Sequence, residues 1–304
     1  MNVQLDRRVF MGAAVAGLAG VALGSSFAAT QKQRWIKKAL KVGMIQPGET
    51  IGDKFKIAAE AGFDGIELDS PGPYNIDDVL AAKDSTELEV PGVVLSTHWS
   101  KPFNHPDQST RDQADQSLAE AIRYCKAVGG TSVLVVPAVV NQSMPYADAY
   151  TQSQAAMKRA APLAQELDIS IAFENVWNNF LLSPLEAARY SDELNDGLDR
   201  HVFGWHFDIG NIVNYGWPEQ WIDTLAHRVI KIDVKDFSRS KRNDEGLWKG
   251  FRVKIGDGES GWDRVRDSLH RIGYSGWAAA EVGGGDLQRL SDIAQRMDRV
   301  FDQA

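Results

Sequence analysis

Residues 40–304 alternate short apolar runs with longer stretches in which apolar residues recur at helical spacing. The short runs end at glycine or polar residues, as buried strands of a sheet commonly do. The predicted strands are Lys41–Ile45, Gly65–Asp69, Gly92–Ser96, Ser132–Val136, Ile169–Phe173, Val202–Asp208, Val229–Asp233 and Trp277–Glu281. The predicted helices are Asp53–Ala61, Ile76–Lys83, Gln108–Val128, Ala147–Leu167, one with Ser183 as N-cap and Pro184 in its first turn, Pro218–Ala226, Trp262–Ile272 and Leu287–Phe301.

This alternation gives eight strand–helix units with no linker-like break or low-complexity segment between them. Strands that alternate with helices form parallel sheets, and eight such units in about 250 residues form a closed (β/α)8 barrel. We therefore expect an α/β protein with one TIM-barrel domain over residues 40–304. A separate segment over residues 1–29 precedes it.

Four of the later strands run into a carboxylate where a loop begins, at Glu174, Asp208, Asp233 and Glu281. In a parallel barrel the C-terminal ends of the strands converge, and active sites lie at that end. Carboxylates held close together repel one another unless a divalent cation neutralises them. The pattern therefore predicts a metal site with these four acids as ligands.

Composition narrows the choice of partners. The chain is 43% hydrophobic and 24% charged, which is typical of a globular protein with a large core. Its formal net charge of −8, without a basic run, argues against a nucleic-acid partner, because binding phosphates needs clustered Lys and Arg. Cys125 is the single cysteine, so neither an internal disulfide nor a thiolate metal site is expected.

The N-terminal segment has the pattern of an export signal. Arg7 and Arg8 precede a mildly apolar run rich in Ala and Gly, and small residues near Ala28 and Ala29 suit cleavage. The paired arginines resemble a twin-arginine signal, with Asp6 where Ser or Thr is commoner. An uncleaved anchor is the alternative. We expect a periplasmic protein whose mature chain has no membrane span.

Several segments, in this order, resemble the xylose-isomerase-like superfamily of TIM barrels, and within it the ketose 3-epimerases and sugar phosphate isomerases/epimerases. They are Ser96–His98, Phe173–Asn175, Asp208–Asn211, Lys235–Asp236, Phe251–Arg252, Gly256–Gly258, and Ile272–Trp277 leading to Glu281. The resemblance covers roughly Val42 to the C-terminus. It implies one divalent cation, usually Mn²⁺, Mg²⁺ or Co²⁺, at the ends of strands five to eight, and a small sugar or keto-sugar as substrate.

Asp233 departs from the family pattern, in which the third ligand is usually a histidine. An aspartate can bind the same ion, and coordination by oxygen alone favours Mg²⁺, Mn²⁺ or Ca²⁺ over the softer Zn²⁺. The alternative is that metal binding has weakened or been lost at this position.

Glu174 and Glu281 are the candidates for catalysis. Isomerising or epimerising an α-hydroxy carbonyl compound requires a proton to leave one carbon and return, and two carboxylates on opposite sides of the substrate can serve as base and acid. The alternative for each is a role as metal ligand alone.

Further residues are candidates for substrate contact: His98, His206, Arg252, Glu67 and Trp177. Arg252 matches a family arginine that reaches the substrate, although a surface arginine is also common. His206 lies two residues before Asp208 on the same face of its strand, so substrate contact and a buried structural role both fit. Glu67 could bind a hydroxyl or only pair with a lysine, and Trp177 could contact a sugar ring or pack at the barrel rim.

Together these features predict a metal-dependent sugar isomerase or epimerase that abstracts a proton next to a carbonyl through a metal-stabilised enediolate. A 3-keto-glycoside lyase or hydratase would use the same metal and base, and the fold hosts both outcomes. The export signal and the lack of a Gly-rich phosphate loop favour an unphosphorylated sugar or glycoside. An abasic-site endonuclease is disfavoured by the acidic charge, and a sugar-binding protein without activity remains a further alternative. The oligomeric state is left open, a homo-oligomer included.

Overall fold

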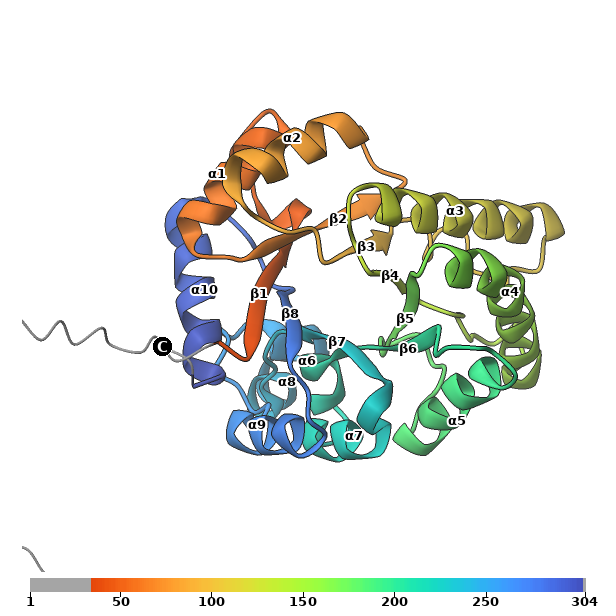
Figure 1. Cartoon of the computed structure of the whole chain (residues 1–304). Helices are drawn as coiled ribbons and strands as arrows, with labels where there is room; N and C mark the ends of the chain where they lie inside the picture. Colours follow the sequence, from red (N-terminus) through yellow and green to blue (C-terminus); the bar gives the residue numbers. More distant parts are fainter. Residues whose placement is uncertain (1–33, 303–304) are drawn as a thin grey trace, which may run out of the picture. The chain divides into compact units, whose positions relative to one another are not determined.

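A computed structural model describes residues 34–302, so the predicted signal segment lies outside the described residues. Parallel strands form a closed barrel in chain order, and β1 pairs with both β2 and β8. The helices lie around the outside of this barrel (Figure 1). The predicted (β/α)8 fold is therefore confirmed. Among the described residues, no helix is both long and apolar enough to cross a membrane.

The strands are β1 Ile36–Lys41, β2 Gly65–Ser70, β3 Gly92–Leu95, β4 Ser132–Val135, β5 Ser170–Glu174, β6 Phe203–Asp208, β7 Val229–Val234 and β8 Gly276–Ala280. The α-helices are α1 Ile51–Ala61, α2 Ile76–Thr86, α3 Gln108–Ala127, α4 Tyr146–Glu166, α5 Pro184–Asn195, α6 Ile209–Val213, α7 Pro218–Leu225, α8 Arg239–Glu245, α9 Trp262–Arg271 and α10 Leu287–Val300. Short 3-10 helices are η1 Val42–Met44, η2 Ala226–Arg228 and η3 Leu247–Phe251.

The first strand lies earlier in the chain than the sequence pattern predicts. β1 ends at Lys41, and the residues expected to continue it form η1 instead. The charge of Lys37 and Lys38 hides the strand from a reading of hydrophobicity. Lys38 is buried because its ammonium group lies 2.7 Å from Asp298 Oδ2 of α10, which supplies the compensating charge.

Alternation along β6 decides which side chains enter the barrel. Trp205 Nε1 donates to Ala187 O of α5, and Phe207 stacks on Trp221 of α7, so these residues face the helical layer. His206 and Asp208, at the intervening positions, are completely buried on the opposite, inner side. Polar side chains thus fill the C-terminal part of the barrel interior.

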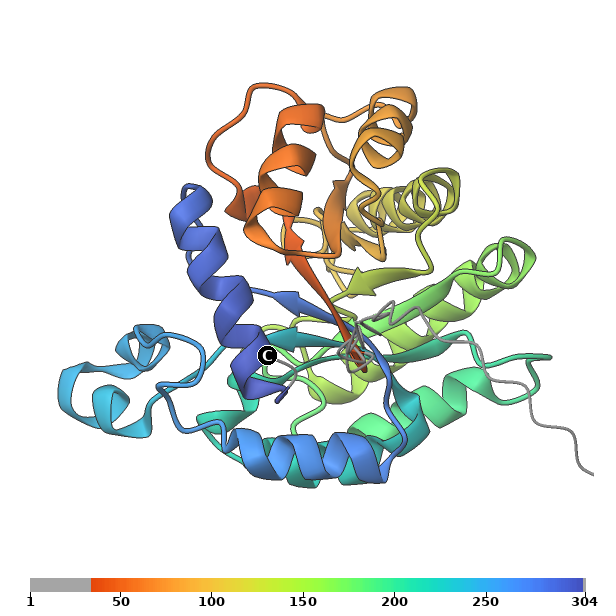
Figure 2. The same ribbon diagram turned by 60° about the vertical axis from the view of Figure 1, so that its left-hand side comes forward.

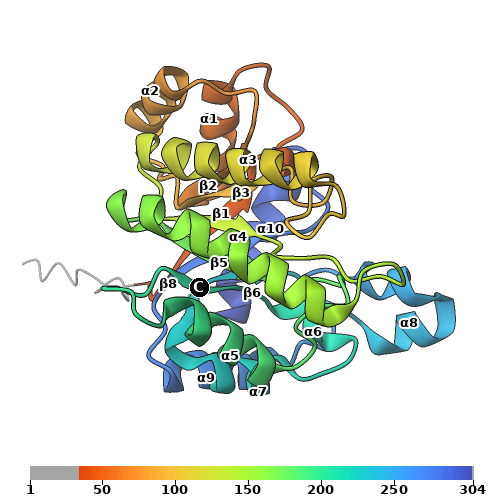
Figure 3. The ribbon, with the colours of Figure 1, turned by 90° about the vertical axis from the view of Figure 1, so that its right-hand side faces the viewer.

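The polar excursion after β7 contains α8 and η3, which the sequence pattern does not reveal. It projects from the end of the barrel at which the strands terminate, as the side views show (Figure 2, Figure 3). The Ser238 amide donates to Gly250 O at 2.8 Å, which closes the base of the excursion. It therefore stands beside the active-site end of the fold.

Candidate active site

The four predicted acids meet at the C-terminal ends of β5 to β8. One carboxylate oxygen from each of Glu174, Asp208, Asp233 and Glu281 lies within 4.8 Å of the corresponding oxygens of the other three. Glu174 and Asp208 end their strands, Asp233 pairs in register with Asp208, and Glu281 follows β8 directly. The first three are buried, and Glu281 is partly exposed to the pocket. The fold therefore brings together the set that the strand ends predicted.

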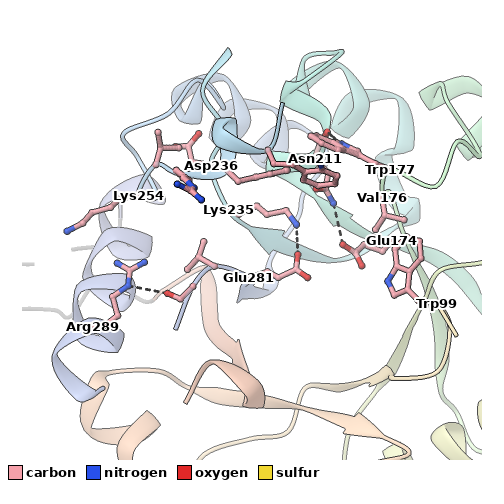
Figure 4. A pocket seen from close by; sticks show the side chains of 16 residues that line it. Trp99, Glu174, Val176, Trp177, Asn211, Lys235, Asp236, Lys254, Glu281 and Arg289 are labelled. Carbon is pink, nitrogen blue, oxygen red and sulfur yellow. Dashed lines mark hydrogen bonds and ion pairs between the residues drawn. The ribbon is translucent and has the colours of Figure 1, made fainter. Parts of the chain in front are cut away.

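Two asparagines hold the first pair of acids in place. The Asn211 amide donates to Asp208 Oδ1 at 2.6 Å, which makes Asp208 the N-cap of α6. The Asn211 side chain donates to Asn175 O and points at Glu174 Oε1, 3.4 Å away (Figure 4). Asn175 exchanges two hydrogen bonds of 2.8 Å with the backbone of Asp208. The carboxylates of Glu174 and Asp208 are thus oriented before any ligand binds.

Lys235 supplies a positive charge inside the cluster. Its ammonium nitrogen lies 3.0 Å from Asp208 Oδ2 and 2.6 Å from Glu281 Oε2. Burial opposes the charged form, but Asp208 and Glu281 more than compensate and raise the pKa of Lys235 above its ordinary value. Lys235 therefore remains an ammonium ion.

The two oxygens of Asp233 have different surroundings. Oδ1 lies 2.9 Å from Lys41 Nζ and 2.8 Å from His206 Nε2, whereas Oδ2 is buried without a hydrogen-bond partner. Burial raises the pKa of Asp233, but His206 and Lys41 outweigh it and bring the pKa below its ordinary value. One oxygen is thus anchored, and the other remains available to a ligand.

Glu67 is occupied by lysines. Its two oxygens accept hydrogen bonds from Lys41 and Lys231, each at 2.6 Å. Burial favours the protonated form, but Lys231 and Lys41 hold the pKa of Glu67 well below its usual range. Glu67, His206 and Asp233 lie close enough to form a second cation group, yet these ammonium groups already neutralise it. We therefore place the metal site at the strand-end acids alone.

The charges of this region leave room for one divalent cation. Five carboxylates (Glu67, Glu174, Asp208, Asp233, Glu281) face three ammonium groups (Lys41, Lys231, Lys235), a formal sum of −5 + 3 = −2. The pKa of Glu174 is raised well above its ordinary value by burial and then by Glu281 and Asp233. Burial likewise raises the pKa of Asp208 well above its ordinary value, with Lys235 opposing and Glu281 adding to the rise.

The donor set fits such a cation. Asp233 Oδ2 is an orphaned buried oxygen, and Asp208 Oδ2 has only the Lys235 ammonium beside it. Buried acceptors without donors are rare in proteins and indicate a missing ion or water. Carboxylate oxygens alone are the ligands preferred by Mg²⁺, Mn²⁺ and Ca²⁺.

A cavity of about 890 Å³ opens above the acids. Glu174, Asn211, Lys235 and Glu281 form its floor (Figure 4). Its walls are aromatic on one side and basic on the other, and include Trp99, Val176, Trp177, Trp248, Phe251, Arg252, Lys254 and Arg289. The cavity can therefore hold an organic ligand in contact with the carboxylates.

The structure separates the other predicted residues into two groups. Trp177 and Arg252 line the cavity. Glu67, His206 and His98 are buried and are not among its lining residues. His98 lies with its Nδ1 3.3 Å from the Val136 amide, and burial together with the Lys41 charge lowers the pKa of His98 to about 4.

Two features of the site were not singled out in the sequence. Lys41 ends β1 in register with Glu67, and a lysine at the end of an inward-facing strand was the available signal. Trp248 and the ring of Phe251 reach the cavity from η3, inside the excursion that looked like polar loop. Nothing in the local pattern shows that this segment folds back over the barrel.

Comparisons with known proteins agree with this geometry. The family model described as xylose isomerase-like TIM barrel matches residues 55–300. The 2-oxo-tetronate isomerase of Pectobacterium atrosepticum is 26% identical over 262 residues, which cover 81% of this chain and 91% of that protein. A crystal structure of a D-tagatose 3-epimerase-like protein has a TM-score of 0.70 at 20% identity, and covers 88% of this chain and 99% of that one. The IolI protein, crystallised with a zinc atom, has a TM-score of 0.72 at 16% identity, with 88% and 99% coverage.

Proposed function

The chain belongs to the xylose isomerase-like TIM barrel family, as its motifs predicted, and from that premise we propose that it is a divalent-metal-dependent sugar isomerase or epimerase. The observation that carries the proposal is the convergence of Glu174, Asp208, Asp233 and Glu281 at the floor of the large cavity. Relatives named as a 2-oxo-tetronate isomerase and a D-tagatose 3-epimerase-like protein support a small keto-sugar or sugar acid as substrate.

In this proposal the four acids hold one cation, Mn²⁺ or Mg²⁺ in the first place and Co²⁺ as a further candidate. When bound, a divalent cation polarises a carbonyl and stabilises the negative charge that develops on its oxygen. The zinc atom reported for IolI supports metal binding in this fold without fixing the ion here. The oxygen-only donor set favours the harder ions.

The two glutamates divide the proton transfer. Glu174 comes from β5 and Glu281 from the end of β8, so they approach the floor of the cavity from different sides (Figure 4). One carboxylate takes the proton from the carbon next to the carbonyl, and the other returns a proton to the substrate. The raised pKa of Glu174 suits this work, because a base with a pKa nearer to neutral can both accept and release a proton.

Two neighbours prepare these acids. Lys235 donates to Glu281 Oε2, which orients that carboxylate and partly offsets the charge of the cluster. Asn211 directs its side-chain amide toward Glu174 Oε1. Arg252, at the cavity wall, is placed to bind a hydroxyl or carboxylate of the substrate.

The direct test is proton exchange. Metal-reconstituted protein is incubated in D₂O with ketohexoses, 2-oxo-tetronate and keto-glycosides, and NMR follows loss of the C–H signal next to the carbonyl. The proposal expects exchange with at least one sugar, with conserved mass, and none after metal removal. No exchange with any substrate would refute it, whereas release of an aglycone would identify the lyase alternative.

We also propose that residues 1–29 direct export by the twin-arginine route and that the mature protein is periplasmic. The paired Arg7 and Arg8 and the small residues near Ala28 support this. In a fusion to a reporter that is active only after twin-arginine export, the native segment should yield activity and Arg7→Lys with Arg8→Lys should abolish it. Equal export of both fusions would exclude that route.

A further inference from the structure

The cavity has an apolar side formed by Trp99, Val176, Trp177, Trp248 and Phe251, which we call the aromatic wall. The Trp177 ring centre lies 4.9 Å from that of Trp248 and 5.1 Å from that of Phe251, so these rings form one continuous surface. Trp248 is 68% exposed and Trp99 is 52% exposed. Large aromatic side chains left in water around a site indicate a binding surface.

The aromatic wall is tied to the reacting groups. The Trp177 indole N–H donates to Asn211 O at 2.9 Å, and the Asn211 side chain points at Glu174. Trp177 and Trp99 stand beside Glu174 (Figure 4). A ligand held by the carboxylates at one end therefore meets the wall at the other, at a separation fixed by these hydrogen bonds.

The outer part of the wall is also held in position. Lys241 Nζ donates to Arg252 O at 2.8 Å, and Ser238 N to Gly250 O at the same distance. A Cβ added to Gly250 would come 2.3 Å from the Phe237 ring, so glycine allows η3 to lie directly on that ring. A surface ordered in advance gains affinity because little entropy is lost when a ligand binds.

The chemistry of the wall selects an apolar partner. Val176 and Phe251 offer no hydrogen-bonding side-chain atoms, and the indole N–H of Trp177 is already used. A second sugar ring placed there would lose hydrogen bonds to water without replacement. A flat apolar group would gain buried area and ring contacts. The cavity of about 890 Å³ lies near the top of the roughly 300–1,000 Å³ range of small-molecule sites, which leaves room beyond one sugar ring.

We propose that the aromatic wall is a subsite for a flat apolar aglycone, so that the substrate is an aryl glycoside whose oxidised sugar ring reacts at the carboxylates. The inference rests on the proposed function, because it extends the ligand of the same site. It adds the substrate class and assigns specificity to Trp248.

Binding separates the two ideas. Isothermal titration of the full-length protein with Mn²⁺ compares phenyl and methyl D-glucopyranosides, as both anomers. At least one phenyl glycoside should bind about 3- to 30-fold more tightly than its methyl counterpart, the range expected for ring contacts. Trp248→Ala should reduce this preference to less than about twofold, and Trp248→Phe should retain most of it.

Trp217→Ala is the matched control, because Trp217 is also half exposed but does not line the cavity. It should leave the preference unchanged. Equal binding of phenyl and methyl glycosides, or a phenyl preference that survives Trp248→Ala, overturns the subsite. A phenyl preference that depends on Trp248, without proton exchange on any sugar, would instead refute the proposed reaction and leave the subsite intact.

Discussion

At the scale of single residues, the two glutamates can be separated from their role as ligands. Gln at either position keeps the shape and one coordinating oxygen but removes the basic carboxylate. With saturating Mn²⁺, Glu174→Gln and Glu281→Gln should each lose about 10²–10⁴-fold in turnover, as expected for a missing general acid or base. Near-normal turnover of a metal-saturated variant would show that the residue is a ligand only.

Asp233 combines a ligand oxygen with a structural one. Asp233→Ala should weaken Mn²⁺ binding at least tenfold in titration calorimetry, because the orphaned Oδ2 is lost. It should also lower the free energy of unfolding without metal by about 3–5 kcal/mol in urea, since Lys41 and His206 lose their buried partner. Asp192→Ala, at an exposed pair with Arg228, is the control. Unchanged metal affinity in Asp233→Ala would remove Asp233 from the ligand set.

His98 gives a pH dependence that does not require the metal. Its pKa of about 4 in the folded protein is below the value of about 6.5 expected after unfolding. Between these values only the unfolded chain takes up the proton, so His98 stabilises the fold fully above pH 6.5 and progressively less as the pH falls toward 4. The loss approaches about 1.4 kcal/mol per pH unit.

Urea titrations of wild type and His98→Gln between pH 7 and pH 4.5 check this expectation. The variant should show a shallower fall in the free energy of unfolding, since glutamine does not titrate. Parallel curves for the two proteins would mean that His98 is not held neutral in the folded state.

At the scale of elements, the excursion with α8 and η3 is a wall of the site as well as a connection between β7 and α9. Gly250→Ala should push η3 off the Phe237 ring. We expect the free energy of unfolding to fall by about 1–3 kcal/mol, the usual effect of overpacking. Any ligand preference that depends on Trp248 should weaken with it.

Gly43→Ala is the matched control for this change, because an added Cβ at Gly43 meets nothing within 4 Å. Thermal unfolding and titration calorimetry measure the two effects. If Gly250→Ala behaves like Gly43→Ala in both, the contact of η3 with Phe237 does not hold the wall in place.

At the scale of the whole molecule, metal binding and folding are linked. The acids come from four different strands, so the site exists only when the barrel is closed. A cation that binds the folded state alone at 100 times its Kd adds about 2.7 kcal/mol of stability. Incubation with EDTA should therefore lower the thermal midpoint, and Mn²⁺ or Mg²⁺ should restore it.

Differential scanning calorimetry with elemental analysis measures both sides of this link. About one divalent ion per chain is expected in protein purified without chelator. Protein that carries no metal, and whose midpoint responds to none, would contradict the metal site while leaving the barrel unaffected.

The sequence by itself determined the barrel, because eight repeats of apolar run and helical period have few other ways to bury their surface. It also placed Glu174, Asp208, Asp233 and Glu281 together, since parallel strands converge at one end. These conclusions depend only on local pattern and on the geometry of strands.

The tertiary structure decided the rest. Only in the folded protein do Lys41 and Lys231 reach Glu67, across separations of 26 and 164 residues, and turn a candidate substrate contact into a buried ion pair. Likewise, Trp248 and Phe251 become part of the cavity because η3 folds back onto Phe237 and Trp177. Side-chain partners distant in sequence leave no periodic signal, because their pairing is set by the closure of the barrel and not by neighbouring residues.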